Sequence, residues 1–142
     1  MRVRTTMTAF AIAATLLGLV SGCGASQDGE EKAVLAEVKA FVVAVNDGDC
    51  TSEAVGLALG TEACEALKAE KYRAKFDPDD PLRVLEVKGR QASARGFMHT
   101  RFNASTGDGF YEPNIDPVFD LTKNDSGHWQ VLRVSEGFII NE

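Results

Sequence analysis

Three cysteines carry the most reactive side chains of this sequence, and their surroundings point to different chemistry. Cys23 directly follows Ser21 and Gly22, two small residues. Signal peptidases have shallow subsites, so small residues at these positions favour cleavage just before Cys23. A thiol at the new N-terminus is the nucleophile that a diacylglycerol transferase needs. Cys23 is therefore predicted to be lipidated on its sulfur, with the chain cut just before it.

The residues before Cys23 have the three parts of a secretory signal. Arg2 and Arg4 give a basic start, and an apolar run follows over residues 9–20. About a dozen apolar residues fall short of the ~20 that cross a bilayer, which favours a signal peptide over a transmembrane helix. A secreted protein in which Cys23 stands by chance is the other alternative.

The stretch from Val20 to Cys23 matches the bacterial lipobox. This resemblance implies that residues 1–22 are a lipoprotein signal peptide and that Cys23 carries a diacylglyceryl group with fatty acids such as palmitate. Two or more acyl chains anchor a protein stably, so the expected location is the cell membrane, facing outside the cytoplasm. Residues 23–29 are small and polar, which predicts a short lipidated tether.

Residues 30–142 are predicted to form one domain. Removing residues 1–22 from the 142-residue chain leaves 120, enough to bury a core without a metal or many disulfides. The removed segment holds two arginines and no acid, so the net charge falls from −6 to −8. Such a charge argues against nucleic acid and anionic lipid as partners. A local basic patch remains open, although the following residues are better interpreted as the solvated face of a helix: Lys68, Lys71, Arg73 and Lys75.

Cys50 and Cys64 are predicted to form a disulfide, because an even pair outside the cytoplasm is oxidised in the simplest case. Closing a loop of about 15 residues adds ~3 kcal/mol in the chain-entropy model. Two buried free thiols are the alternative. Zinc is not expected, since His99 and His128 are the only histidines and lack the close paired spacing of a structural site. We expect no metal and no cofactor.

The first half of the domain is predicted to be helical. One apolar stripe predicts a long helix over residues 30–46, followed by Gly48 in the left-handed cap position. Two shorter helices are predicted from Thr51 or Ser52 to Leu59 and from Thr61 to about Ala74. The stripe consists of Val34, Val38, Phe41, Val42 and Val45.

The second half is predicted to form an antiparallel sheet, because its strands follow one another through hairpin-type turns. Strands are expected over residues 82–88, 91–103, 117–124 and 128–135, with a loop over residues 103–117. One face of the long second strand consists of Ala92, Ala94, Gly96, Met98, Thr100 and Phe102.

This order of elements resembles the nuclear transport factor two-like superfamily, the cystatin-like α+β cone, and especially its small lipoproteins from high-GC Gram-positive bacteria. The resemblance covers roughly Glu31 to Val134. Its local signals are the helix that ends in Gly48-Asp49 and the closing strand around Trp129. It implies an α+β domain in which a long N-terminal helix packs on a curved antiparallel sheet around a conical cavity.

Members of this superfamily that catalyse proton transfer place an Asp or His base, with a Tyr or second acid, inside the cone. The resemblance therefore implies candidate pocket residues, but no catalytic residue is assigned. A cross-strand ion pair of Arg101 with Asp120, a solvent-facing His99 and a core Trp129 are the structural alternatives. The candidates are Tyr72, His99, Arg101, Tyr111, Asp120 and Trp129.

Three functions remain open, because fold does not determine function. The first is a non-enzymatic role at the cell envelope, binding a lipid or small apolar molecule or supporting a protein complex. The second is a structural or protein-interaction module, such as a homodimer. The third is an isomerase or dehydratase. A deep apolar cavity favours the first, whereas a buried His99 or Asp120 beside a Tyr favours the third.

Overall fold

The computed structural model describes residues 23–103, 107, 109–135 and 137–138. The predicted signal peptide, residues 1–22, lies outside the described residues, and so does the side chain of Cys23. The helices are α1 (Cys23–Asp47), α2 (Glu53–Ala58) and α3 (Thr61–Ala69). The strands are β1 (Arg73–Phe76), β2 (Arg83–Lys88), β3 (Gln91–Arg95), β4 (Met98–Asn103), β5 (Phe110–Tyr111), β6 (Asn114–Ile115), β7 (Val118–Lys123) and β8 (Trp129–Val134).

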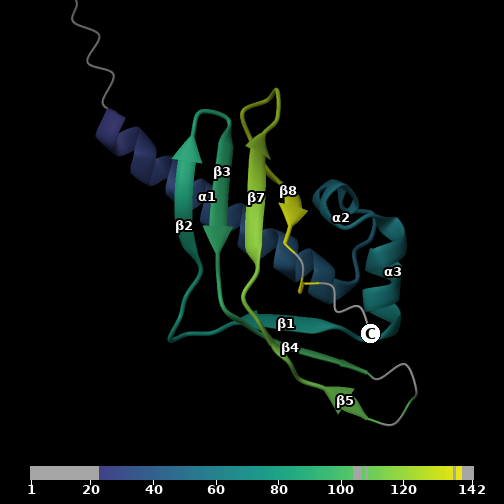
Figure 1. The fold of residues 1–142 in the computed structure, drawn as a ribbon. Coiled ribbons are helices and arrows are strands. Elements are labelled where there is room, and N and C mark those ends of the chain that lie inside the picture. The colour runs from purple at the N-terminus through teal and green to yellow at the C-terminus, as the bar shows by residue number, and fades with distance from the viewer. Residues whose placement is uncertain (1–22, 104–106, 108, 136, 139–142) are drawn as a thin grey trace, which may run out of the picture.

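The strands form two antiparallel sheets that the long helix joins. One sheet has the order β2-β3-β7-β8; in the other, β4 pairs with β1, β5 and β6. α1 crosses behind the larger sheet, and its C-terminal end reaches β1 and the two short helices (Figure 1). The predicted α+β fold with a long helix on antiparallel sheet is confirmed.

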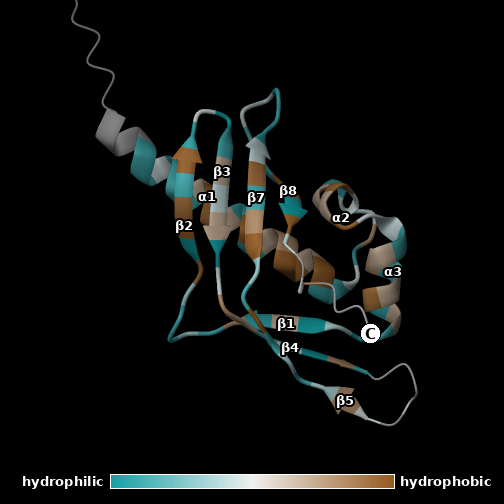
Figure 2. Ribbon diagram, viewed as in Figure 1, coloured by the Kyte–Doolittle hydropathy of each residue, from teal (hydrophilic) through white to brown (hydrophobic). Residues whose placement is uncertain are grey.

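The predicted stripe of α1 is the face that packs on the sheets. All of its members are 5% exposed or less, and Figure 2 shows the apolar part of α1 behind the strands. Phe41 packs its ring against Phe119 and Phe138, with ring centroids 6.2 and 5.8 Å apart. Tyr72 joins this cluster through Phe138, with ring centroids 5.7 Å apart. Large aromatic side chains therefore fill the space between helix and sheets.

The second short helix ends earlier than predicted. α3 stops at Ala69, and Lys71 takes a positive φ of 55°. The N–H of Tyr72 then bonds to the carbonyl of Leu67, and that of Lys71 to the carbonyl of Lys68. This is a Schellman motif, with a lysine where glycine is usual. The prediction of a helix to about Ala74 is wrong, because this cap turns the chain into β1.

The predicted long strand over residues 91–103 is divided in two. β3 pairs with β2 and β7, whereas β4 pairs with β1 in the other sheet. The break falls at Gly96, where a Cβ atom would lie 2.7 Å from the ring of Phe76. A residue without a side chain lets the backbone bend at that close contact. The residues predicted to share one face nevertheless do so across the break, since Ala94, Met98 and Thr100 are all buried.

Two further predictions differ from the structure at the ends of elements. The predicted loop over residues 103–117 contains the short strands β5 and β6. The long helix begins at Cys23 rather than near residue 30, so helix covers the segment predicted to be a tether. Within the described part of the chain, no helix has the length and apolar character needed to cross a membrane.

Cys50 and Cys64 form the predicted disulfide. Their Cα atoms are 5.6 Å apart, within the usual range for this bond. Cys50 follows α1, and Cys64 lies in the first turns of α3. The bond therefore joins the end of the long helix to the last helix before β1.

Candidate functional site

β1 and β4 turn a row of basic side chains outward. In their antiparallel register Arg73 lies opposite Arg101, and Lys75 lies opposite His99. Successive side chains of a strand point to opposite faces, so residues two apart share a face. All four side chains are exposed. The pairing of these two strands therefore gathers four basic residues on one outer surface.

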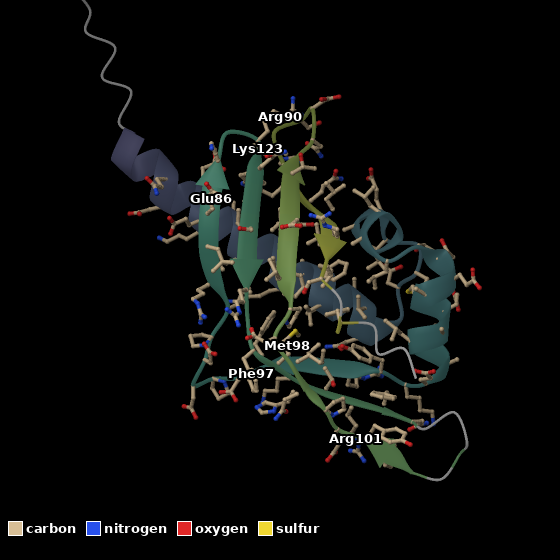
Figure 3. The ribbon with its side chains drawn as sticks, in the orientation of Figure 1. Glu86, Arg90, Phe97, Met98, Arg101 and Lys123 are labelled. Atoms are coloured by element: carbon tan, nitrogen blue, oxygen red, sulfur yellow. A yellow bond between two sulfur atoms is a disulfide. The ribbon has the colours of Figure 1, made fainter. Side chains whose placement is uncertain are left out.

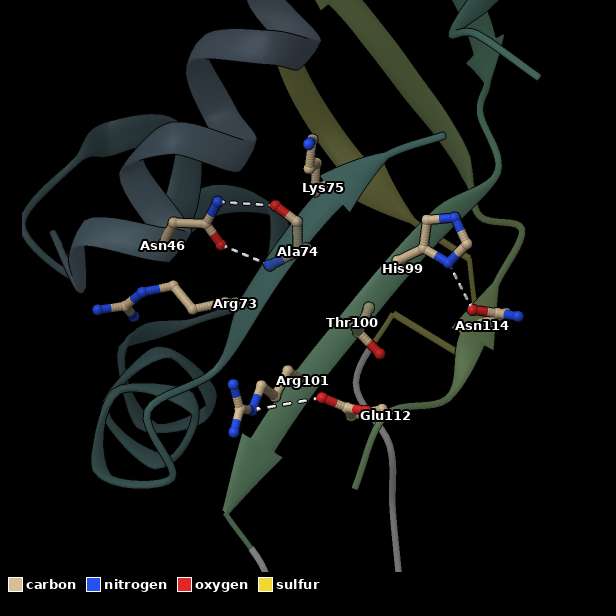
Figure 4. Close-up of a pocket in the computed structure, with 9 residues that line it drawn as sticks. All are labelled: Asn46, Arg73, Ala74, Lys75, His99, Thr100, Arg101, Glu112 and Asn114. Atoms are coloured by element: carbon tan, nitrogen blue, oxygen red, sulfur yellow. Dashed lines mark hydrogen bonds and ion pairs between the residues drawn. The ribbon is translucent and has the colours of Figure 1, made fainter. Parts of the chain in front are cut away.

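An open groove of about 640 Å³ lies over this surface (Figure 4). We call it the basic groove. Its lining comes from the end of α1, from β1, from β4 and from the segment that holds β5 and β6. The lining residues are Asn46, Arg73, Ala74, Lys75, His99, Thr100, Arg101, Glu112 and Asn114.

Asn46, in the last turn of α1, holds β1 in place. Its Nδ2 donates to the carbonyl oxygen of Ala74 at 2.8 Å, and the N–H of Ala74 donates to its Oδ1, also at 2.8 Å. β1 is an edge strand, so these bonds satisfy backbone groups that no further strand pairs. The long helix is thus tied directly to the strand that carries Arg73 and Lys75.

His99 lies between two acceptor oxygens. Its Nε2 is 2.6 Å from Oδ2 of Asp77, and its Nδ1 is 2.8 Å from Oδ1 of Asn114. The bonds to Asn114 and Asp77 raise the pKa of His99 above its usual value. Backbone N–H donation from Asp79, followed by His99, lowers the pKa of Asp77. Both ring nitrogens can donate only when the imidazole is protonated, so this arrangement favours a cationic His99.

Arg101 is steadied by two neighbours at the far side of the groove. Its Nε lies 3.5 Å from Oε1 of Glu112, and its guanidinium carbon lies 3.9 Å from the ring centroid of Phe110. Phe110 is 59% exposed, so this cation–π contact is on the surface. Figure 4 shows Glu112 on the Nε side of the guanidinium, with both Nη groups on the side away from that carboxylate.

Arg73 and Lys75 have no carboxylate within ion-pair distance among the described residues. Nη1 of Arg73 instead donates to the carbonyl oxygen of Tyr72 at 2.8 Å. The other described arginines each have a carboxylate partner: Arg83, Arg90, Arg95, Arg101 and Arg133. The predicted helical face of lysines and arginine is therefore wrong at Arg73 and Lys75, which belong to the basic groove.

The candidate tyrosines lie away from His99. Tyr72 is 1% exposed, its hydroxyl donates to the carbonyl oxygen of Phe138 at 3.3 Å, and burial raises its pKa. It packs inside the domain, whereas His99 is on the outer face of the sheet. Tyr111 stacks on Phe102 with ring centroids 5.4 Å apart and is half exposed.

Asp120 lies on the other sheet, so the predicted ion pair between Arg101 and Asp120 is wrong. Oδ2 of Asp120 accepts bonds from Nη2 and Nε of Arg133, its cross-strand neighbour on β8, at 2.6 and 2.9 Å. Arg101 pairs with Glu112 instead. The cross-strand ion pair expected for Asp120 does exist, but its partner is Arg133.

Trp129 is a core residue with one polar contact. It is 5% exposed, and its indole N–H donates to Oε2 of Glu30 on α1 at 2.7 Å. The other oxygen of Glu30 accepts a bond from Lys123, whose ammonium lies 5.1 Å from the Trp129 ring centroid. These bonds lower the pKa of Glu30 and join the N-terminal half of α1 to the β7–β8 hairpin.

The candidate residues are not assembled for proton transfer inside the cone. Such chemistry needs a base within hydrogen-bond reach of a substrate in a pocket that tunes its pKa. His99 faces solvent, Asp120 is paired on a second sheet, and Tyr72 is in the core. Among the described residues, no three His, Cys, Asp or Glu side chains are placed to hold a metal ion.

Several residues of the groove were not predicted from the sequence. Tyr72-Arg73-Ala74-Lys75-Phe76 alternates apolar and charged residues, a strand pattern that would have placed Arg73 and Lys75 on one face. Asp77 and Asn114 had no local signal. They are 22 and 15 residues from His99 in sequence, and only the fold brings them together.

No protein-family profile and no curated protein matches the chain in sequence. Solved structures match it in fold. A Mycobacterium tuberculosis protein of unknown function is 16% identical, with a TM-score of 0.62 over 81% of this chain and 75% of that one. A nuclear transport factor 2-like superfamily protein from Salmonella enterica is 12% identical, with a TM-score of 0.60 over 76% and 89%. A ketosteroid isomerase-like protein from Erwinia carotovora is 14% identical, with a TM-score of 0.59 over 74% and 92%.

These likenesses define the class of fold. The chain has the nuclear transport factor two-like fold, the cystatin-like α+β cone, as the order of its elements predicted. At identities of 12–16% the likeness concerns the fold alone. The function must therefore be argued from the groove and from the N-terminal sequence.

Proposed function

We propose that this chain is a lipoprotein anchored through Cys23 outside the cytoplasm, and that its domain is a non-enzymatic ligand-binding module. The basic groove is the ligand site. The observation that carries this proposal is the concentration of exposed basic side chains over β1 and β4 in a chain whose net charge is −6.

The positions of the two ends of α1 support this arrangement. α1 begins at Cys23, and Asn46 near its other end lines the groove. A helix rises about 1.5 Å per residue, so about 35 Å of helix separates Cys23 from the groove. Figure 3 shows Arg101 at the opposite end of the molecule from Lys123, which pairs with Glu30 near the start of α1. A lipid on Cys23 leaves the groove remote from the attachment point.

The packing of the interior directs a ligand to the outside of the sheet. The space between α1 and the sheets holds the rings of Phe41, Phe119 and Phe138 in mutual contact, and Tyr72 packs against Phe138. The apolar ligand expected inside the cone would have to displace these side chains. The groove over β1 and β4 needs no such rearrangement.

Lipid attachment is tested with Cys23→Ala in the native host. Wild-type protein should partition into the detergent phase, carry the mass of a lipidated N-terminus, and be digested by protease added to cells stripped of their wall. Cys23→Ala should accumulate as precursor and lose detergent partitioning, whereas Ser26→Ala, outside the lipobox, should behave as wild type. Unchanged partitioning of Cys23→Ala would refute the anchor.

Ligand binding is tested with ¹⁵N-labelled mature protein in neutral detergent micelles and small-molecule extracts of the host envelope and medium. A ligand in the basic groove should shift the amide resonances of Ala74, Lys75, Thr100 and Arg101. The amides of Ser93 and Thr122, on the larger sheet, serve as controls. Shifts confined to those controls, or no shifts with any extract, would contradict a ligand site in the groove.

A further inference from the structure

We propose that the ligand of the basic groove carries a phosphate dianion, as in the phosphate monoester of a small organic molecule. This inference rests on the proposed function, because it takes the groove to be the ligand site. It adds the chemical group that the groove recognises and the residues that bind it, Arg73, Lys75 and Arg101.

The balance of charge in the groove selects a dianion. His99 and Asp77 compensate each other in their ion pair. Among the described residues that line the groove, Arg73, Lys75 and Arg101 are the other cations, and Glu112 is the one carboxylate. About two positive charges are left uncompensated. A phosphate monoester carries a charge of about −1.5 to −2 near pH 7, whereas a carboxylate carries −1.

The strand register places like charges opposite each other in the free protein, and a bound anion would relieve their repulsion. Arg73 lies directly opposite Arg101, and Lys75 directly opposite His99. Like charges in directly opposed cross-strand positions destabilise a sheet. Arg73 and Arg101 are such a pair, and no described carboxylate pairs with Arg73 or Lys75. An anion over the strands would turn this repulsion into attraction.

The guanidinium groups suit a phosphate in geometry as well as in charge. An arginine offers a planar fork of donors that bonds two oxygens of one phosphate. Glu112 approaches Arg101 at Nε, and both Nη groups lie on the side away from that carboxylate (Figure 4). Nη1 of Arg73 bonds a backbone carbonyl, which leaves its Nη2 available. Lys75 is about 7 Å along the strand from Arg73, within reach of the same ligand.

The surrounding charge favours a small ligand over a phosphate polymer or membrane. The whole chain has a net charge of −6, so a large polyanion would meet repulsion outside the groove. A phospholipid headgroup is the other source of phosphate, but its phosphodiester carries one charge. With lipid on Cys23, about 35 Å of helix separates the groove from the anchoring point.

The test is calorimetric titration of the mature lipoprotein, in neutral detergent, with inorganic phosphate and glycerol 3-phosphate. Arg73→Gln and Arg101→Gln should each weaken binding at least tenfold. The matched control is Arg133→Gln, which removes the same charge from the other sheet and should bind as wild type. In phosphate-free buffer, Arg73→Gln should have a melting temperature equal to or above the wild type, because it removes a facing like charge.

The outcomes separate the possible errors. If Arg133→Gln weakened phosphate binding as much as Arg73→Gln does, phosphate would be responding to the overall charge of the protein, and the proposed site would be overturned. A lipid-free protein that begins at residue 24 is also mixed with vesicles. Its flotation with phosphatidylglycerol vesicles, but not with phosphatidylcholine vesicles, would overturn the small-molecule source in favour of lipid if Arg73→Gln abolishes that flotation. No heat with either phosphate, together with extract-induced shifts in the groove, would overturn the phosphate while the proposed function stands. Absence of both signals would overturn both.

Discussion

Nε2 of His99 lies 2.6 Å from Oδ2 of Asp77. This contact joins β4 to the turn that follows β1. Oδ1 of the same aspartate accepts bonds from the backbone N–H groups of Asp79 and Asp80, at 2.6 and 3.3 Å. Asp77 therefore orders the turn and orients the imidazole at the same time.

The pair predicts a stability that depends on pH. The raised pKa of His99 adds stability that is fully present below its unfolded value of ~6.5 and is lost as pH rises through the higher folded pKa. The lowered pKa of Asp77 adds stability that is present above ~3.9 and is lost as pH falls through the lower folded pKa. The contribution should be largest between about pH 4 and 6.5.

The measurement is urea unfolding of wild type and His99→Gln across pH. The loss of unfolding free energy caused by His99→Gln should be largest near pH 5 and should shrink as pH rises above the folded pKa of His99. His128→Gln, at an exposed position of the β7–β8 turn, is the control for removing a histidine. A loss for His99→Gln that stays constant with pH would contradict the ion pair.

Phe41→Ala should cost about 3–5 kcal/mol of unfolding free energy. Phe41 is 2% exposed and contacts the rings of Phe119 and Phe138, so truncation leaves a cavity at the centre of the domain. Val43→Ala, on the same helix but 57% exposed, should change stability by less than about 0.5 kcal/mol. Similar losses of unfolding free energy for the two variants would contradict the burial of the Phe41 face of α1.

Cys50 and Cys64 should both resist thiol labelling in denatured, unreduced mature protein, because their sulfurs are bonded to each other. Reduction should expose both. Replacing both by Ala should cost about 3 kcal/mol, since the unfolded chain regains the freedom of a closed loop of about 15 residues. Two labelled thiols before reduction would refute the bond.

Gly96→Ala should destabilise the domain by about 1–3 kcal/mol through overpacking. The added Cβ would lie 2.7 Å from the Phe76 ring and 3.1 Å from Leu82. Gly56→Ala is the control: it lies within α2 with nothing near the new methyl, and should stabilise by about 0.5–1 kcal/mol. A neutral Gly96→Ala would mean that β3 and β4 do not meet Phe76 as described.

The periodicity of apolar residues predicted the elements that have one buried face and one exposed face. The stripe of α1 and the shared face of residues 92–102 were both recognisable, because each kind of element repeats with its own period. A glycine directly after the long helix predicted a left-handed cap at Gly48, and its φ of 67° confirms that conformation. The disulfide followed from the count of cysteines remaining after Cys23.

Only the tertiary structure decided which residues form the candidate site. Lys71 ends α3 with a positive φ, which is uncommon for a lysine and could not be predicted from the residue type. At Gly96 the chain passes from one sheet to the other, so one predicted strand becomes two. Arg73 and Arg101 face each other because β1 pairs with β4, a contact between strands more than twenty residues apart. Local propensity acts over a few neighbouring residues, whereas strand pairing is chosen by packing across the whole chain. The sequence by itself therefore determined the fold class, and the lipid anchor on Cys23 is a prediction from the sequence alone. The tertiary structure alone assembled the basic groove.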